Sequence, residues 1–129
     1  MQPIFINHTN HVSEKWSATQ RHAAEAYGTI VDVPFPNIPP QWNEAEVQRM
    51  ARSCADTILA MNPAAVLCQG EFTYVYALIQ LLRQQHILVL AACSERVSEE
   101  YIGEDGISHR ISRFQFVQFR QYGKEELYG

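Results

Sequence analysis

The chain has 129 residues, 47% of them hydrophobic and 19% charged, which fits one soluble domain with a single core. Its 10 Lys and Arg against 14 Asp and Glu give a net charge of −4, whereas proteins that bind long nucleic acid carry a basic surface. No apolar run reaches the roughly 18 residues of a membrane span, and the chain does not begin with a basic segment followed by an apolar stretch. We therefore expect a single cytoplasmic domain without membrane or long nucleic-acid partners.

The first third of the chain predicts a strand, a helix and a second strand. Residues 3–6 (PIFI) are typical of a short buried strand. After a polar loop, Ser17 and Gln20 have the spacing of a capping box that begins a helix, and Gly28 ends that helix. Residues 29–35 (TIVDVPF) predict the second strand. The prolines that follow favour an extended loop, because proline has no amide donor for a helix or a ladder.

The middle of the chain repeats this alternation. Asn43 and Glu46 form a second capping box, and the apolar residues behind them recur at steps of three and four, as one buried helix face requires. Residues 64–69 (AAVLCQ) predict a third strand that is covered on both faces, because polar residues do not alternate in it. Residues 70–73 then form a tight turn into an apolar helix over residues 74–85.

The last third begins as a fourth strand at residues 87–93 (ILVLAAC) and then changes its period. Residues 97–122 predict a β-hairpin with Asp105 and Gly106 in its turn. The alternation of strands and helices predicts an α/β fold: a Rossmann-like, mainly parallel sheet with helices on both faces and a C-terminal β-hairpin. We expect one domain over residues 1–129, with the strand–helix core in about residues 3–95.

Polar residues concentrate where three of the predicted strands end. In doubly wound sheets, ligands bind beyond the carboxyl ends of the strands, where the strand order reverses. A strand order of 2-1-3-4 puts that crevice between strands one and three, beside residues 7–13 (NHTNHVS) and 69–73 (QGEFT). Residues 93–96 (CSER) follow strand four and add to the rim of the crevice. This coincidence of topology and polarity predicts a ligand site.

The two histidines of the first loop are open to three interpretations. A zinc site needs three or four ligands, and Glu71 and Glu95 are the nearest additions to His8 and His11, but no metal-binding spacing is present. Alternatively, His8 is a satisfied histidine at a strand end and His11 a surface residue. In the third interpretation, the loop contacts phosphate or ribose through polar side chains and backbone amides. We predict no metal and no cofactor.

The segment QGEFT also has two interpretations. Gly70 lets the backbone turn sharply or approach a ligand, and Thr73 is expected to cap the next helix. Glu71 is either an exposed first-turn carboxylate that complements the helix dipole, or an acceptor for a ribose hydroxyl or an adenine amino group. Neither a GxGxxG nor a P-loop motif is present, and no serine stands in a nucleophile elbow.

The segment CSER supplies further polar groups. Ser94 and Arg96 are candidate ligands for an anion, and Glu95 is a candidate acceptor. The alternative is a surface ion pair of Arg96 with Glu99 or Glu100.

Four segments together resemble a known family: FINHTNHVSEKWSATQ, VDVPFPNIPP, VLCQGEFTYVYALI and LAACSERVSEE. They are similar to small single-domain proteins encoded beside type III CRISPR systems, which are built as CRISPR-associated Rossmann-fold (CARF-like) domains. The resemblance covers most of residues 4–122. It implies a homodimer that binds a cyclic oligoadenylate second messenger across its two-fold axis. Some members are ring nucleases, which open the ring without metal by using a ribose 2′-hydroxyl as the nucleophile.

The resemblance also suggests where a ligand would bind. The ligand contacts of the family lie after the first strand and at the glycine turn before a later helix, which here are Asn10, His11, Ser13, Gly70, Glu71 and Thr73. The aromatic residues of the hairpin, Phe114, Phe116 and Phe119, offer an apolar face to the domain or to the second protomer.

Our hypothesis is a protein that binds a cyclic oligoadenylate and cleaves it as a metal-independent ring nuclease. Two alternatives stay open: a non-catalytic sensor or sponge for the same ligand, and a nucleoside deoxyribosyltransferase-like enzyme with Glu71 or Glu95 as nucleophile. The candidate catalytic residues are His11, Ser13 and Glu71, and His11 is preferred to His8 because it lies further into the loop. The candidate ligand contacts are Asn7, His8, Thr9, Asn10, Gln69, Gly70, Phe72, Thr73, Ser94, Glu95 and Arg96.

Overall fold

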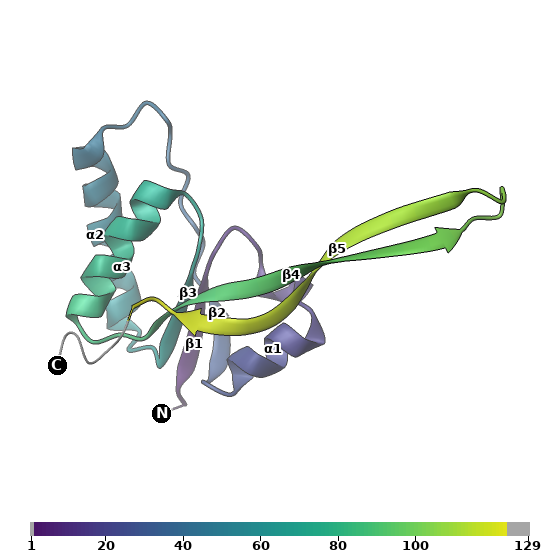
Figure 1. The fold of residues 1–129 in the computed structure, drawn as a ribbon. Coiled ribbons are helices and arrows are strands. Elements are labelled where there is room, and N and C mark those ends of the chain that lie inside the picture. The colour runs from purple at the N-terminus through teal and green to yellow at the C-terminus, as the bar shows by residue number, and fades with distance from the viewer. Residues whose placement is uncertain (1, 124–129) are drawn as a thin grey trace.

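A five-stranded sheet is the frame of the fold (Figure 1). The structure, a computed structural model, describes residues 2–123. The strands stand in the order β2-β1-β3-β4-β5, which confirms the expected 2-1-3-4 order of the first four. Their bounds are β1 Ile4–His8, β2 Thr29–Asp32, β3 Ala65–Cys68, β4 Val89–Ile102 and β5 Ser108–Gln121.

The sheet is mixed, not mainly parallel as the sequence suggested. β1 pairs in parallel with β2 and with β3, and β3 pairs in parallel with β4 over only two residue pairs. The antiparallel ladder of β4 and β5 is the longest, because it runs from Leu90–Gln121 to Ile102–Ser108. The parallel strands are connected by long crossovers through helices, whereas β4 and β5 are joined by a short turn, so their ladder can extend along the whole length of both strands. The chain therefore has an α/β fold with a mixed sheet.

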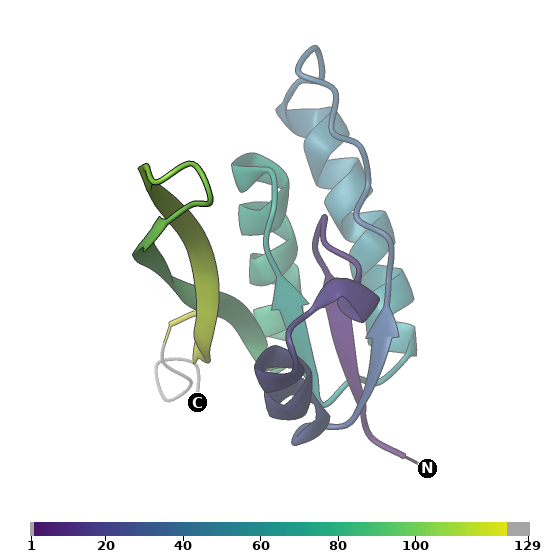
Figure 2. The same cartoon turned by 90° about the vertical axis from the view of Figure 1, so that its right-hand side faces the viewer.

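Helices cover both faces of the sheet, as expected. The helices are α1 Ala18–Glu25, α2 Glu44–Ala60 and α3 Phe72–Gln84, and a 3-10 turn, η1 Ser13–Lys15, precedes α1. In Figure 2, α1 lies in front of the sheet and α2 and α3 lie behind it. Successive strand residues point to opposite faces, so Phe5 and Leu67 pack toward α1 while Ile6 and Val66 pack toward α2 and α3.

Side-chain caps fix where the helices begin. Asn43 caps α2: its Oδ1 accepts from the amide of Glu46 at 3.0 Å, and Glu46 Oε1 accepts from the amide of Asn43 at 3.3 Å, so the predicted capping box is confirmed. At α1, Ser17 Oγ accepts from the amide of Gln20 at 3.2 Å. The expected cap of α3 was wrong. Glu71 occupies that position instead of Thr73, and its side chain reaches the third amide of the helix.

The last residues of β1 and β2 differ from the prediction, β3 is one residue shorter at each end, and β4 begins at Val89 instead of residue 87. β1 continues to His8, beyond residue 6, because its polar last residues pair with β2 on one side and β3 on the other. β2 ends at Asp32, before residue 35, because Pro34 and Pro36 cannot donate to a ladder.

The largest correction concerns β4. The sequence suggested a strand that ends at residue 93 and a separate hairpin from residue 97, but β4 continues without interruption from Val89 to Ile102. Ser94, Glu95 and Arg96 are therefore strand residues and not a loop. Only a register shift between Cys93 and Ser94 marks the point where β4 and β5 leave the body of the protein.

Beyond this shift the two strands form a projecting ribbon, residues 94–116, which we call the arm (Figure 1). Its turn contains Asp105 and Gly106, as expected: Asp105 Oδ1 accepts from the amide of Ile107 at 2.9 Å, and Gly106 has a φ of 75°. None of the helices within residues 2–123 is long and apolar enough to cross a lipid bilayer.

The capping box of α2 gives a test of the fold. Replacing Asn43 with Ala removes the acceptor of the Glu46 amide, and we expect the free energy of unfolding to fall by about 1 kcal/mol. Urea denaturation followed by circular dichroism measures this change. Gln48→Ala, an exposed position on the same helix, is the matched control and is expected to leave the stability unchanged or slightly higher. Equal stability of the Asn43→Ala variant and the unmodified protein would contradict the role of this cap.

Candidate functional site

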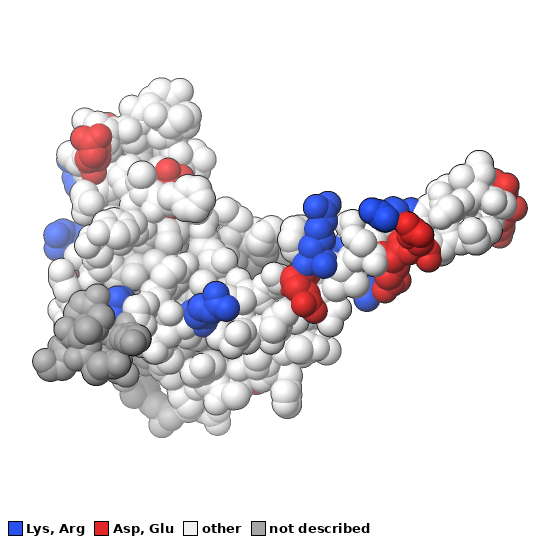
Figure 3. Space-filling view, viewed as in Figure 1, with Lys and Arg blue, Asp and Glu red and all other residues white. Residues whose placement is uncertain are grey.

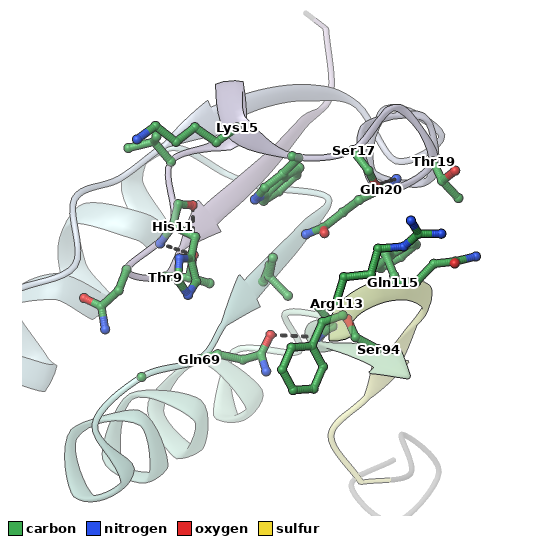
Figure 4. Close-up of a pocket in the computed structure, with 18 residues that line it drawn as sticks. Thr9, His11, Lys15, Ser17, Thr19, Gln20, Gln69, Ser94, Arg113 and Gln115 are labelled. Carbon is green, nitrogen blue, oxygen red and sulfur yellow. Dashed lines mark hydrogen bonds between the residues drawn. The ribbon is translucent and has the colours of Figure 1, made fainter. Parts of the chain in front are cut away.

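A pocket of about 1090 Å³ opens between the loop after β1, the start of α1 and the base of the arm (Figure 4). It lies at the carboxyl ends of β1 and β3, on the face of the sheet that carries α1, where Leu67 and Ala92 line it. The sequence predicted the two flanking strands. It did not predict that α1 and the arm would form the other two walls. The lining residues are Thr9, Asn10, His11, Val12, Lys15, Trp16, Ser17, Thr19, Gln20, Leu67, Gln69, Gly70, Ala92, Ser94, Arg113, Phe114, Gln115 and Phe116.

Asn7 organises the loop that presents His11 to the pocket. The Asn7 side chain is buried, and its Nδ2 donates to the carbonyl oxygen of His11 at 2.8 Å. Thr9 completes the turn, because its hydroxyl donates to Asn7 Oδ1 at 2.9 Å and accepts from the amide of His11 at 3.1 Å. Both the amide and the carbonyl of His11 are thus held by side chains, and its exposed imidazole lies at the pocket (Figure 4).

Asp32, at the end of β2, fixes the rest of this loop. Its Oδ1 accepts from Asn7 Nδ2 at 2.9 Å, and its Oδ2 accepts from the hydroxyl and the amide of Ser13 at 3.1 and 3.3 Å. The carbonyl of Ser13 in turn accepts from the guanidinium of Arg21 on α1. Ser13, a candidate catalytic residue, thus has a hydroxyl that is bound within the protein and does not line the pocket. The sequence reasoning missed Asp32, since a single Asp in a strand carries no motif.

His8 points to the other face of β1 and is fully buried. Its Nδ1 lies 2.9 Å from the carbonyl oxygen of Val33, and its Nε2 lies 2.8 Å from the hydroxyl of Tyr74 on α3. A carbonyl can only accept, so Nδ1 carries the proton and Nε2 accepts from Tyr74. Burial lowers the pKa of His8, against the raising effect of the bond to Val33. His8 is therefore a satisfied neutral histidine that positions α3, and His11 is the histidine that lines the pocket.

Glu71 and its neighbours belong to the start of α3. Glu71 Oε1 accepts from the amide of Tyr74 at 2.8 Å and from the hydroxyl of Thr73 at 2.7 Å, and these bonds lower the pKa of Glu71. Phe72 is 89% exposed. Glu71, Phe72 and Thr73 do not line the pocket, whereas Gln69 and Gly70, which precede them, do. Gly70 is required here, because a Cβ on it would lie 2.2 Å from the ring of Phe35.

Gln69 connects two strands beside the pocket. Its Oε1 accepts from the amide of Ala92 at 2.8 Å, so its Nε2 is the end that remains for a ligand (Figure 4). Ser94 also lines the pocket, from the first residue of the arm. Glu95 and Arg96 follow it on exposed strand positions and do not contribute to the lining. The structure thus brings six of the candidate residues to the pocket: Thr9, Asn10, His11, Gln69, Gly70 and Ser94.

The pocket also has lining residues that the sequence reasoning did not select. Lys15 and Trp16 come from the segment before α1, and Arg113, Phe114 and Gln115 come from β5. The lining therefore includes two cations and no carboxylate among the described residues. Arg113 is partly compensated, because its Nη2 lies 3.3 Å from Glu99 Oε1 on an exposed part of the arm. Arg113 is far in the sequence from the lining residues of the first loop and of α1, and no motif connects it with them, so the sequence did not indicate that it belongs to the pocket.

This arrangement is suited to a polar, anionic ligand. Lys15 and Arg113 supply positive charge, and Gln69 and His11 supply donors. Trp16 and Phe114 add aromatic surface on which a planar group can stack. Among residues 2–123, no group of three or more His, Cys, Asp or Glu side chains is placed to hold a metal ion.

Comparison with known proteins places the chain in a family. The model of the Uncharacterized protein MJ1673 family matches residues 3–120. The chain belongs to this family. The matched range includes β1 to β4, β5 up to its last residue, the loop after β1 and the whole arm, so each wall of the pocket falls within the family's range. No curated protein and no solved structure matches the chain.

The buried histidine makes stability depend on pH. Because burial lowers the pKa of His8, the unfolded chain binds its proton more tightly than the folded protein does. We expect the free energy of unfolding to be fully retained above about pH 6.5 and to fall as the pH drops through this value and below it. Urea denaturation at pH 8, 7, 6 and 5 measures the slope. The variant His8→Gln is expected to have a smaller slope, and an unchanged slope would assign the effect to other groups.

Proposed function

We propose that the protein binds a cyclic oligoadenylate in this pocket and opens the ring by metal-independent phosphodiester cleavage. The observation that carries the proposal is the position of His11. Its backbone is held on both sides by Asn7 and Thr9, and its imidazole faces a pocket of about 1090 Å³ that also contains Lys15 and Arg113. An imidazole and two cations that line one pocket are suited to hold a phosphodiester and to supply a proton to it.

Two further arguments support the ligand class. The pocket lies at the carboxyl ends of the central parallel strands, where Rossmann-like sheets bind nucleotides. We therefore propose that this sheet is related to the Rossmann-like folds. The resemblance to CARF-like proteins adds the cyclic oligoadenylate and its origin in type III CRISPR signalling. A net charge of −4 is compatible with a small anionic ligand, because the cations that meet it are local.

In the proposed reaction, a ribose 2′-oxygen attacks the adjacent phosphorus. The O2′–P bond forms as the P–O5′ bond breaks, which yields a 2′,3′-cyclic phosphate and a 5′-hydroxyl. The 2′-hydroxyl loses its proton to solvent, and the His11 imidazole protonates the leaving 5′-oxygen. Lys15, Arg113 and Gln69 Nε2 hold the phosphate oxygens and stabilise their additional charge. Ser13 and Glu71 act indirectly in this scheme, through Asp32 and through the start of α3.

One alternative keeps the same pocket. A non-catalytic sensor or sponge is supported by the absence of a carboxylate among the described lining residues, since no second acid–base group stands opposite His11. A nucleoside deoxyribosyltransferase-like reaction needs a carboxylate nucleophile in the pocket. The two candidates for that role do not line it: Glu71 caps α3, and Glu95 stands on the exposed arm.

Incubation with cyclic tetra-adenylate distinguishes these functions. We expect linear product with a 2′,3′-cyclic phosphate end on chromatography, at an unchanged rate in excess EDTA. Intact ligand that co-elutes with the protein would reject the ring nuclease and support the non-catalytic sensor or sponge. Absence of both binding and cleavage, tested with rings of other sizes as well, would reject the ligand class.

His11 is the residue on which cleavage depends in this proposal. We expect His11→Ala to lower the turnover of cyclic tetra-adenylate by at least about tenfold, because the leaving oxygen loses its proton donor. The exposed imidazole makes no hydrogen bond that folding requires, so the thermal unfolding of the variant should match that of the unmodified protein. His22→Ala, an exposed histidine on α1 outside the pocket lining, is the control. Full turnover in His11→Ala would make the loop a binding element only.

A further inference from the structure

The arm leaves large apolar side chains in water. Ile102 is 70% exposed, Ile111 52% and Phe114 77%. Tyr101 and Ile107 are exposed as well, so the arm carries five of the nine large hydrophobic side chains that are exposed among residues 2–123. A two-stranded ribbon without a covering layer has marginal stability in water, because it cannot bury its apolar residues. The arm therefore needs a second surface to pack against.

These side chains lie on both faces of the arm. Glu99 pairs with Ile111, and Tyr101 pairs with His109, so Tyr101 and Ile111 share one face. Ile102 is the neighbour of Tyr101 along β4, so its side chain points to the opposite face. Phe114 shares that opposite face, because it pairs with Arg96, which lies an even number of residues from Ile102 on the same strand. A flat surface covers only one face of a ribbon. A partner that encloses the arm covers both.

The charge of the arm argues against nucleic acid and anionic lipid. Residues 94–116 contain three Arg and five Asp or Glu, which gives 3 − 5 = −2. Two of these arginines are already paired within the arm, Arg110 with Glu100 at 2.9 Å and Arg113 with Glu99 at 3.3 Å. Figure 3 shows basic and acidic side chains following one another along the arm. A polyanion would be repelled by this surface.

The same pattern is complementary to itself. Arg96, Glu95 and Glu104 form no ion pair among residues 2–123, so two antiparallel arms can place Arg96 of one copy against a Glu of the other, which a two-fold axis does twice. The edges of the arm are also open. β5 is the last strand of the sheet, and β3 pairs with β4 only up to Leu90. An open edge accepts another strand, and a second arm offers one of equal length.

We propose that the arm is the interface by which two copies of this chain associate, each arm packing against the arm and body of the other copy. This inference does not depend on the proposed ligand. It has a consequence for the pocket, because Phe114 and Arg113 belong to the arm and also line the pocket. Association fixes one wall of each pocket, so the second copy orders the site of the first.

Sedimentation velocity of the full chain without ligand, over a range of concentrations, tests the proposal. We expect a dimer, and we expect Ile102→Lys and Ile111→Lys each to raise its dissociation constant at least about tenfold. The two variants probe opposite faces of the arm. Lysine is chosen because Glu99 lies directly across the ladder from residue 111, and Glu100 lies two residues from 102, so the new charge does not disturb the arm itself. Thermal unfolding of both variants verifies that each remains folded.

The matched control is Phe72→Lys, which makes the same change at an exposed aromatic on α3, outside the arm. We expect this variant to dimerise like the unmodified protein. A wild-type chain that stays monomeric at all concentrations would overturn the proposal. So would a dimer that dissociates on Phe72→Lys and persists in both arm variants, because the interface would then lie on α3.

Discussion

The last two residues of β1 carry the polar side chains that the rest of the site depends on. Asn7 and His8 are the buried polar residues among residues 2–123, and the strand turns their side chains to opposite faces of the sheet. A buried polar group must be hydrogen-bonded, and each of these finds partners from several elements. Asn7 connects the first loop with Asp32 of β2, and His8 connects Val33 with Tyr74 of α3. One strand end thereby sets the positions of three neighbouring segments.

This constraint separates the buried structural histidine, His8, from His11, the one that we propose as catalytic. His8 is held neutral by burial and by two partners, so its ring cannot reach a ligand. The hydrogen bonds of Asn7 and Thr9 involve only the backbone of His11, which leaves the imidazole for the pocket. The polar groups of Asn7 and His8 are used to hold the fold in place. The chemistry that we propose rests instead on His11, three positions further along the chain.

The pocket and the arm share residues, because the base of the arm forms one wall of the pocket. The strands and α1 form a pocket that stays open on the side where β4 and β5 leave the body, and the first residues of the arm close that side. The remaining length of the arm carries exposed apolar side chains on both faces, between charged ones, and has open edges. A second copy that covers the arm would therefore also steady Arg113 and Phe114 at the pocket. Ligand binding and association are coupled through these shared residues in our two proposals.

The sequence by itself determined the local elements: the capping box of Asn43, the strand order of the first four strands, the hairpin turn at Asp105, and the first loop as a polar site. These depend on neighbours in the chain, on periodicity and on short connections. The tertiary structure alone decided the rest. Glu71 became a cap, Ser94 became a strand residue, and Asp32, Lys15 and Arg113 joined the site from separate elements. The physical reason is that a hydrogen bond or a pocket wall between distant segments requires no local pattern, so only the packing of the sheet brings such residues together.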